Sequence, residues 1–328
     1  MTGSHFDNSD VWDAFLAFSA RLGKNRLRVQ GPGGNTSIKA DGQMWIKASG
    51  TELADALVQP IFVEVDHAAA LAEANGAGDG SCKDTVINSA IKLRPSIETT
   101  FHAALDWPVV AHTHSILSLS HIVSPQGRAM AADKLAGMNF TSVPYVKPGR
   151  DLTYQIMKQV TSATNVILLE NHGLICCGGT VEETELLMDE VEARLAVTVQ
   201  SMAASCDAAP VPGYDWVPEV GRLATDPDFF KAALAGSYYP DHVVFLGPGL
   251  PSLENADGRP SVLVEGHGVL LKSNATASQR AMLFCLADMF SHQQNGWEPE
   301  CIGIEAEAEL LNWDAEKYRQ ELARKGGG

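Results

Sequence analysis

The sequence predicts an α/β protein with a mixed β-sheet flanked by helices. The chain has 328 residues, which is the length of about two average domains. Apolar residues make up 45% of it and charged residues 20%, as in packed globular proteins. From residue 96 onward, helical and strand patterns alternate, and this alternation is typical of a sheet with helices on its faces.

The N-terminal third is expected to contain one helix and three short strands. Apolar residues recur at helical spacing over residues 7–23 and predict the helix. An Asp41-Gly42 pair is a typical β-hairpin turn and is flanked by two strand patterns. The three predicted strands are 36–39, 44–47 and 61–65.

The middle of the chain shows the alternation most clearly. Thr180 is placed to cap a long amphipathic helix that continues to about residue 202, with acidic residues in its first turn. The other predicted helices are 96–105, 115–122 and 151–161, and the predicted buried strands are 109–112 and 166–169.

Two prolines and weak periodicity between residues 204 and 213 predict a domain boundary near residue 208. We therefore expect a first domain over 1–208 and a smaller C-terminal α/β domain over 209–328. The second domain has its own strand and helix patterns. These are strands at 243–246, 262–264 and 269–271, and helices at 277–290 and 314–323.

Part of the C-terminal domain repeats earlier sequence. Residues 262–270 align with residues 167–175 at a constant offset of 95, and the helix after each copy keeps that offset. The match covers a strand, a His-Gly turn and a helix. It predicts that the C-terminal domain is in part a repeat of the 166–195 unit.

Charge and hydropathy narrow the classes of function. With 24 basic and 40 acidic residues the net charge is −16, which disfavours nucleic acid and anionic lipid as partners. No run approaches the roughly 18 apolar residues of a membrane span, and the first ten residues lack a secretory signal pattern. Six scattered cysteines do not form a disulfide framework. We expect a reduced, cytoplasmic protein without a membrane partner.

The clearest chemical pattern is His112-Thr113-His114 at the end of an apolar strand. His172 also follows an apolar strand and precedes a glycine, which makes it the best candidate for a third ligand. Three neutral imidazoles with open positions are typical of a catalytic zinc-type site. The alternative is that these are satisfied core histidines.

Two further features have a chemical and a plain structural interpretation. Glu98 could be a ligand or general base near a cation, although its position alone favours a first-turn helix charge. The small-residue turns at 33–35 and 48–51, with Ser96 at a helix start, could bind phosphate through backbone amides. From the residues alone, tight turns are the favoured interpretation.

Taken together, these pieces resemble the class II aldolase/adducin family over residues 10–205. Five motifs occur in that family's order, and five ordered motifs are far more specific than one. They are Gly34-Asn35-Thr36-Ser37, Lys47-Ala48-Ser49-Gly50-Thr51, Pro95-Ser96-Ile97-Glu98, His112-Thr113-His114 and Asn171-His172-Gly173-Leu174.

The resemblance implies a class II aldolase-like three-layer fold with a central mixed or antiparallel sheet, and it implies a set of site residues. It assigns the catalytic position to Glu98 and reverses the plain interpretation given above. It implies a divalent metal, zinc first and Mn²⁺, Co²⁺ or Fe²⁺ as alternatives, on His112, His114 and His172. It implies a phosphate pocket formed by Asn35, Ser49, Gly50 and Ser96.

The activity implied is that of a carbon–carbon lyase in carbohydrate metabolism. It would cleave a small ketose phosphate or related hydroxy-ketone through a metal-stabilised enediolate. An epimerase or decarboxylase of the same superfamily is the alternative, and a non-catalytic adducin-like interaction protein is a further one. The family also implies a homo-oligomer, a tetramer by resemblance.

The chain departs from the family's pattern at three places. Ile97 stands where the Ser-Ser-acid phosphate signature has its second serine. No tyrosine lies between His114 and Phe140, where the fuculose-phosphate aldolases carry a catalytic one. Residues 239–247 resemble the extension of long aldolase domains fused to short-chain dehydrogenases. His267, the repeat's counterpart of His172, is interpreted as structural.

Overall fold

The computed structural model describes residues 9–88, 92–206 and 209–325 and divides into two compact units. Unit 1 contains residues 1–115 and 134–195, and unit 2 contains residues 116–133 and 196–328. The segment 116–133 therefore groups with the C-terminal residues. The predicted boundary at residue 208 and the first two residues of the predicted helix over 7–23 lie outside the described residues.

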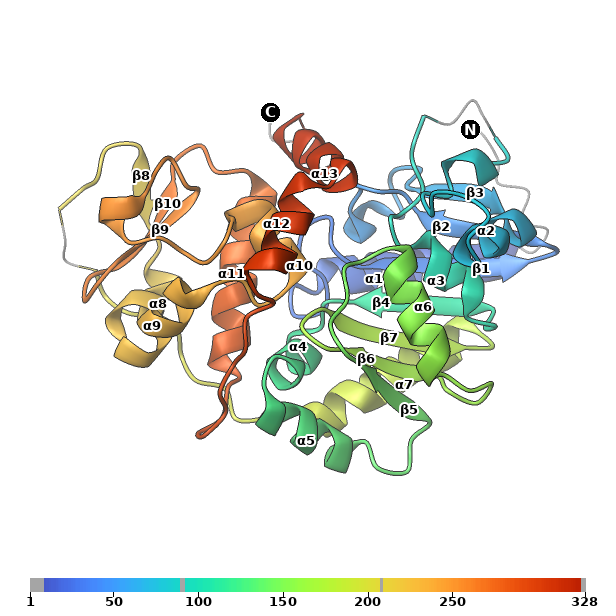
Figure 1. The fold of residues 1–328 in the computed structure, drawn as a ribbon, viewed down its shortest axis with the longest axis horizontal. Helices are drawn as coiled ribbons and strands as arrows, with labels where there is room; N and C mark the ends of the chain where they lie inside the picture. Colours follow the sequence, from blue (N-terminus) through green and yellow to red (C-terminus); the bar gives the residue numbers. More distant parts are fainter. Residues whose placement is uncertain (1–8, 89–91, 207–208, 326–328) are drawn as a thin grey trace. The chain divides into compact units, whose positions relative to one another are not determined.

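Unit 1 is built on a seven-stranded sheet with the order β3-β2-β1-β4-β7-β6-β5 (Figure 1). Only β5 and β6 pair in parallel, so the sheet is mixed, as the sequence predicts. Asp41 and Gly42, both at positive φ, form the turn of the predicted β1–β2 hairpin. The strands are β1 (Asn35–Ala40), β2 (Gln43–Lys47), β3 (Phe62–Asp66), β4 (Val109–Thr113), β5 (Phe140–Val143), β6 (Val166–Leu169) and β7 (Gly173–Gly178).

Helices cover both faces of this sheet and give three layers. On one face α1 and α7 pack together, and Ser19 of α1 shares a hydrogen bond with Thr36 of β1. On the other face lie α2, α3 and α6 (Figure 1). The helices of unit 1 are α1 (Ser9–Lys24), α2 (His67–Ala74), α3 (Thr99–Ala104), α6 (Arg150–Gln159) and α7 (Val181–Leu195).

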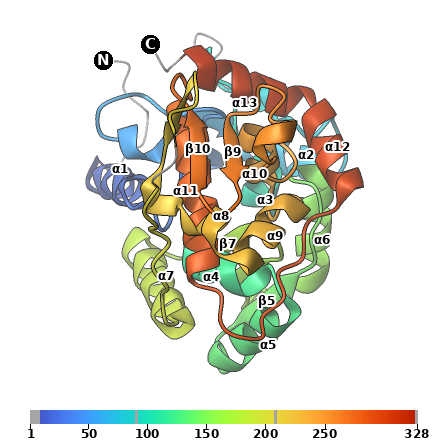
Figure 2. The same ribbon diagram turned by 90° about the vertical axis from the view of Figure 1, so that its left-hand side faces the viewer.

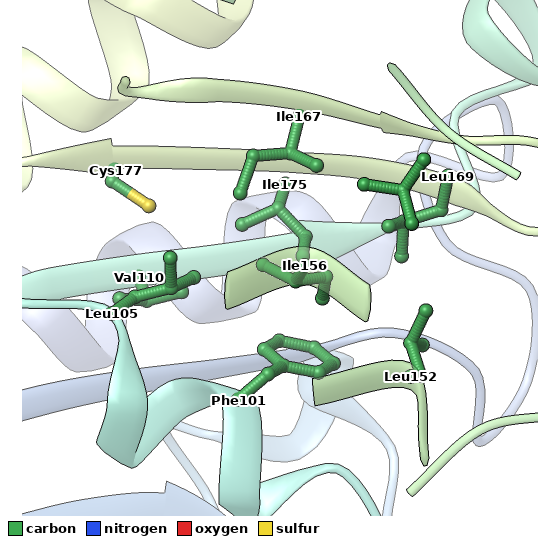
Figure 3. Close-up of a cluster of buried hydrophobic side chains, with 10 residues drawn as sticks. Phe101, Leu105, Val110, Leu152, Ile156, Ile167, Leu169, Ile175 and Cys177 are labelled. Carbon is green, nitrogen blue, oxygen red and sulfur yellow. The ribbon is translucent and has the colours of Figure 1, made fainter. Parts of the chain in front are cut away.

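A hydrophobic core fills the space between the sheet and the pair α3 and α6. Figure 3 shows side chains from both helices pointing at those of β4, β6 and β7. Phe101 and Leu105 contribute from the α3 segment, and Leu152 and Ile156 from α6. All are at most 2% exposed, and full burial of one such side chain stabilises a fold by about 1.5–3 kcal/mol. This core fixes α3 over the sheet, directly beside the site described below.

Unit 2 contains a three-stranded antiparallel sheet and several helices (Figure 2). The strand order is β8-β10-β9, with β8 (Tyr214–Trp216), β9 (Ser261–Val264) and β10 (Gly268–Lys272). The long helix α11 begins with a capping box formed by Thr276 and Gln279. The helices are α4 (Ile116–Ile122), α5 (Pro125–Lys134), α8 (Arg222–Thr225), α9 (Pro227–Ala235), α10 (Pro240–Leu246), α11 (Ala277–Ser291), α12 (Ile304–Asn312) and α13 (Asp314–Lys325).

One predicted strand is wrong, and two predicted helices are shorter than expected. Residues 243–246 form part of helix α10, not a strand, because Pro240 presets its first turn and Gly247 ends it at positive φ. The helix predicted to reach residue 202 ends at Leu195, just before the β-branched run Val197-Thr198-Val199. Glu98 is the N-cap residue of α3 and does not lie in the first turn of a helix starting at Ser96.

Among the described residues, no helix is both long enough and apolar enough to cross a bilayer.

Candidate metal and acid–base site

Two imidazoles come from the end of the central strand β4. His112 and His114 are two residues apart, and such side chains lie on the same face of a strand. Since β4 pairs with β1 on one side and β7 on the other, both histidines are enclosed by protein. His112 is fully buried and His114 is 5% exposed.

The third imidazole comes from the tight turn between β6 and β7. Asn171 adopts positive φ there, and the amide of His172 donates to Leu169 O at 3.0 Å. The next residue must be glycine, because a Cβ at Gly173 would lie 2.4 Å from Thr113 O and 3.0 Å from the His112 ring. Gly173 therefore lets the turn approach the end of β4 closely enough to bring His172 beside the pair.

The three rings form one buried cluster. The centroid of the His112 ring lies 5.1 Å from that of His114 and 4.9 Å from that of His172, and the third pair is 5.4 Å apart. One ligating nitrogen of each lies within 4.8 Å of the others. The three histidines predicted from sequence are thus brought together by the fold.

The hydrogen bond of His112 sets which of its nitrogens can bind a metal. Its Nδ1 donates to Leu174 O at 3.1 Å, so Nε2 carries the lone pair in the neutral ring. That Nε2 is buried without a hydrogen-bond partner and lies 3.6 Å from Glu98 Oε2. A neutral imidazole oriented by a backbone carbonyl is the usual arrangement of a metal-ligating histidine. The donor set therefore fits a divalent metal of the zinc type.

Glu98 lies against this cluster. Its Oε1 is 3.3 Å from His172 Nε2, and its Oε2 is 3.6 Å from His112 Nε2. The residue is only 5% exposed. The spacing of the sequence favours a helix charge, whereas the structure puts the carboxylate beside two of the three imidazoles. Such a carboxylate can exchange a proton with a group bound at the cluster.

Asn35 and Ser96, both expected in a phosphate pocket, contact each other and Glu98. Asn35 Nδ2 donates to Glu98 Oε2 at 2.7 Å and to Ser96 Oγ at 3.2 Å. The amide of Glu98 also donates to Ser96 Oγ at 3.2 Å. In this arrangement the amide group of Asn35 is directed at the carboxylate of Glu98.

Ser49 and Gly50 lie in a neighbouring turn that is tied to the same region. The amide of Ser49 donates to Arg94 O and that of Ser96 donates to Lys47 O, so the two segments run side by side. Lys47, 2% exposed, donates from Nζ to Pro32 O at 2.8 Å and to Thr51 O at 2.6 Å. It thereby joins the two small-residue turns. The sequence around Lys47 is largely apolar and gave no signal that its ammonium group joins these turns.

Two other residues missed by the sequence analysis are His102 and Ser37. His102 Nε2 contacts Asn35 Oδ1, and its Nδ1 lies 2.7 Å from Ser37 Oγ. Complete burial lowers the pKa of His102 well below its usual range, and the charge of nearby Lys39 adds to the effect. His102 is four residues after Glu98. Residues at this spacing lie on the same side of a helix, and this was the signal in the sequence that could have placed His102 near Glu98.

Two other residues with titratable side chains, Glu170 and His267, are not part of the cluster. Glu170, just before the β6–β7 turn, accepts a hydrogen bond from Ser142 Oγ at 3.3 Å. His267 in unit 2 is exposed, and the described residues that could share a metal do not include it.

Comparison with known proteins places this arrangement in a family. Residues 14–199 match the Class II Aldolase and Adducin N-terminal domain. This match covers more than half of the chain, and the chain therefore belongs to the class II aldolase/adducin family. Class II aldolases generally use a divalent metal, and the buried three-histidine cluster could bind one.

Individual relatives agree with this assignment. The uncharacterized oxidoreductase YuxG of Bacillus subtilis is 32% identical over 176 residues, 49% of this chain and 25% of that protein. A Pseudomonas aeruginosa protein named "Putative aldolase class 2 protein" is 24% identical over 179 residues, 51% of this chain and 65% of that protein. The chain thus spans a quarter of the first relative and just under two thirds of the second.

A solved structure shows the same fold. The N-terminal class II aldolase domain of a conserved protein from Thermoplasma acidophilum superimposes with a TM-score of 0.51 at 25% identity. The superposition covers 60% of this chain and 95% of that domain. The match to an oxidoreductase agrees with the resemblance to aldolase domains fused to dehydrogenases.

Proposed function

We propose that this chain is a metal-dependent aldolase that cleaves a small ketose phosphate or a related hydroxy-ketone. The observation that carries the proposal is the buried carboxylate of Glu98, 3.3 Å and 3.6 Å from Nε2 of His172 and His112. A proton-transfer group beside a metal-type donor set is what cleavage next to a carbonyl requires.

His112, His114 and His172 would hold the metal, with zinc expected first and Mn²⁺, Co²⁺ or Fe²⁺ as alternatives. A divalent cation there supplies Lewis acidity, which polarises a substrate carbonyl and stabilises the negative charge that develops on its oxygen. Burial of the three histidines keeps bulk water out and strengthens that interaction.

Glu98 would move the proton. In the direction of synthesis it removes a C–H proton next to the carbonyl of the donor, and in cleavage it returns that proton to carbon. The amide of Asn35 holds one carboxylate oxygen, while the other faces His172.

Asn35, Ser49, Gly50 and Ser96 form the proposed anion pocket. Ser96 Oγ accepts from Asn35 and from the amide of Glu98, so its own hydrogen can be donated to a substrate oxygen. Ile97 supplies no hydroxyl next to it. The pocket therefore offers one serine donor fewer than the family signature.

The test is hydrogen exchange into dihydroxyacetone phosphate, followed by proton NMR in deuterated water with metal-loaded protein. This half reaction needs no knowledge of the aldehyde. Wild type is expected to exchange one C–H proton stereospecifically, and Glu98→Gln to exchange roughly 10²–10⁴-fold more slowly while keeping its metal. Glu170→Gln is the matched control, because it makes the same change at a carboxylate of unit 1 that accepts a hydrogen bond from Ser142 Oγ and is not part of the three-histidine cluster.

Absence of exchange in wild type with bound metal would contradict an aldolase that uses this donor. Assays of epimerase and decarboxylase activity would then follow, with the lost serine at Ile97 as a reason to include unphosphorylated substrates. A purified protein without stoichiometric metal would instead favour a non-catalytic, adducin-like interaction protein. The proposal also includes a homo-oligomer, a tetramer by resemblance, which light scattering would test.

A further inference from the structure

Next to Glu98, a row of buried polar side chains connects the carboxylate to the middle of strand β1. Ser37, His102 and Asn35 follow one another in this row, and Asn35 contacts Glu98. Ser37 and His102 are fully buried and Asn35 is 4% exposed. Asn35 and Ser37 are alternate residues of β1, so both point to the face that α3 covers.

The hydrogen bonds of this row can run in only one direction. An ionised carboxylate only accepts, so the group of Asn35 that faces Glu98 is its NH₂. The carbonyl Oδ1 of Asn35 then faces His102, whose Nε2 must carry the hydrogen. A neutral ring protonated on Nε2 has its lone pair on Nδ1, and this lone pair accepts from the hydroxyl of Ser37.

The His102 ring is held between the hydrophobic core and strand β1. Its plane stacks on Phe101 with centroids 4.6 Å apart, and Phe101 belongs to the hydrophobic core under α3. Both ring nitrogens are committed to β1, on which Asn35 and Ser37 lie. His102 is thus fixed by the core on one side, and on the other its Nε2–H donates to Oδ1 of Asn35.

We propose that His102 is a positioning residue: its Nε2–H donates to Oδ1 of Asn35, keeps the NH₂ of Asn35 toward Glu98 and so holds the carboxylate against the histidine cluster. The consequence for catalysis rests on the proposed function, whereas the hydrogen-bond direction does not. If Asn35 turned over, its Oδ1 would face the carboxylate, and two acceptors at 2.7 Å repel each other.

Three variants separate positioning from general stability. His102→Leu removes both ring hydrogen bonds, and His102→Gln keeps an NH₂ donor near the place of Nε2. Ser37→Ala deletes only the hydroxyl that donates to Nδ1. Ser19→Ala is the matched control, because Ser19 pairs with Thr36 at 2.8 Å on the opposite face of β1 and is equally buried.

The first readout is nitrogen-15 NMR of the His102 ring in the zinc-loaded full-length protein, which needs no substrate. Wild type and Ser19→Ala are expected to show the neutral ring with hydrogen on Nε2. In Ser37→Ala the ring is expected to keep its hydrogen on Nε2, because Oδ1 of Asn35 still accepts it, while Nδ1 loses the hydrogen bond from the hydroxyl. A wild-type ring protonated on Nδ1, or a Ser37→Ala ring whose hydrogen moves to Nδ1, would overturn the proposed hydrogen-bond direction.

The second readout is the exchange reaction with dihydroxyacetone phosphate, with metal content measured in parallel. His102→Leu is expected to lower kcat by about 10- to 100-fold with little change in KM and unchanged zinc, and His102→Gln to recover most of the loss. Wild-type kcat in His102→Leu, or equal losses in His102→Leu and His102→Gln, would overturn the positioning role. If wild type itself shows no exchange while NMR finds hydrogen on Nε2, the proposed function fails and the hydrogen-bond direction stands.

Discussion

Two regions of the molecule share one three-stranded arrangement, and only one of them has a candidate site. In unit 1, the β6–β7 hairpin pairs Leu169 with Gly173, and in unit 2 the β9–β10 hairpin pairs Val264 with Gly268. These positions differ by the offset of 95 seen in the sequence. Each hairpin is followed by a 15-residue helix, α7 or α11.

The two units differ in the strand that pairs with the hairpin, which is β4 in unit 1 and β8 in unit 2. The second strand of each hairpin also pairs with a third strand. In unit 1, β7 pairs with β4, and His112 lies opposite Ile175. In unit 2, β10 pairs with β8, and Trp216 lies opposite Leu270. Ile175 and Leu270 are again 95 residues apart, so Trp216 occupies the position of His112. The residue two further on is His114 in one case and Pro218 in the other.

The hairpin turn alone therefore does not make a metal site. Both turns contain a His-Gly pair, yet His172 is buried against two further imidazoles while His267 is exposed. A metal site also requires the two histidines that β4 brings beside the turn, His112 and His114, and the burial of all three rings. The experiments below test this difference.

The largest effect is expected from His114→Ala compared with His267→Ala. Removal of one of three clustered imidazoles should abolish stoichiometric metal binding and activity, because three ligands are needed to hold the ion in a site that keeps open positions. His267→Ala should retain both. Elemental analysis after dialysis measures the metal. Tight metal in His114→Ala would refute the three-histidine assignment.

A smaller effect is expected from His242, a fully buried histidine of unit 2. Burial lowers the pKa of His242 from 6.5 to about 3, with the charge of Arg259 as a lesser cause. Between these values the unfolded chain binds a proton that the folded chain does not, so stability falls as the pH drops below about 6.5. From pH 7 to pH 5 this amounts to about 2 kcal/mol.

His242→Asn should remove that part of the acid sensitivity, since an amide does not titrate. Urea unfolding at pH 7 and pH 5 gives the difference for each protein, and His267→Asn serves as the exposed control. Buried His102 in unit 1 leaves an acid dependence of its own in both variants. An unchanged pH difference in His242→Asn would contradict the prediction.

The smallest effect is expected at the two turns. Asn171 at φ 53° and Gly266 at φ 71° are corresponding positions in the left-handed region. Asn171→Gly and Gly266→Asn should each change the free energy of unfolding by less than about 1 kcal/mol, because asparagine and glycine both accept this conformation. A Cβ at Gly266 has no atom within 4 Å. Asn171→Val should cost more, which thermal unfolding would show.

The sequence predicted most of the sheet around the site but not all of it. β4 and β6 are apolar runs that end in polar residues, and this pattern was enough to find them together with His112, His114 and His172. β7 was missed because Gly173–Gly178 is buried on both faces and shows no alternation. The run at 243–246 has β-forming residues, but Pro240 and Gly247 around it decide for a helix.

The acid–base part of the site depends on packing that a sequence does not show. The spacing of Glu98 alone favours a helix charge, and only the position of α3 over β1 and β4 brings the carboxylate to the cluster. The contacts of His102 and Lys47 likewise join segments far apart along the chain. The resemblance assigned Glu98 through its motif, whereas His102 and Lys47 fell outside the expected site residues.

The origin of the three imidazoles also bears on how the protein is made. Two lie at the end of β4 and the third in the turn before β7, with α4, α5, β5, α6 and β6 between them along the chain. During synthesis, a nascent chain holds no complete ligand set until β7 has left the ribosome and paired with β4. We therefore expect metal uptake at the proposed site to follow the pairing of β7 with β4.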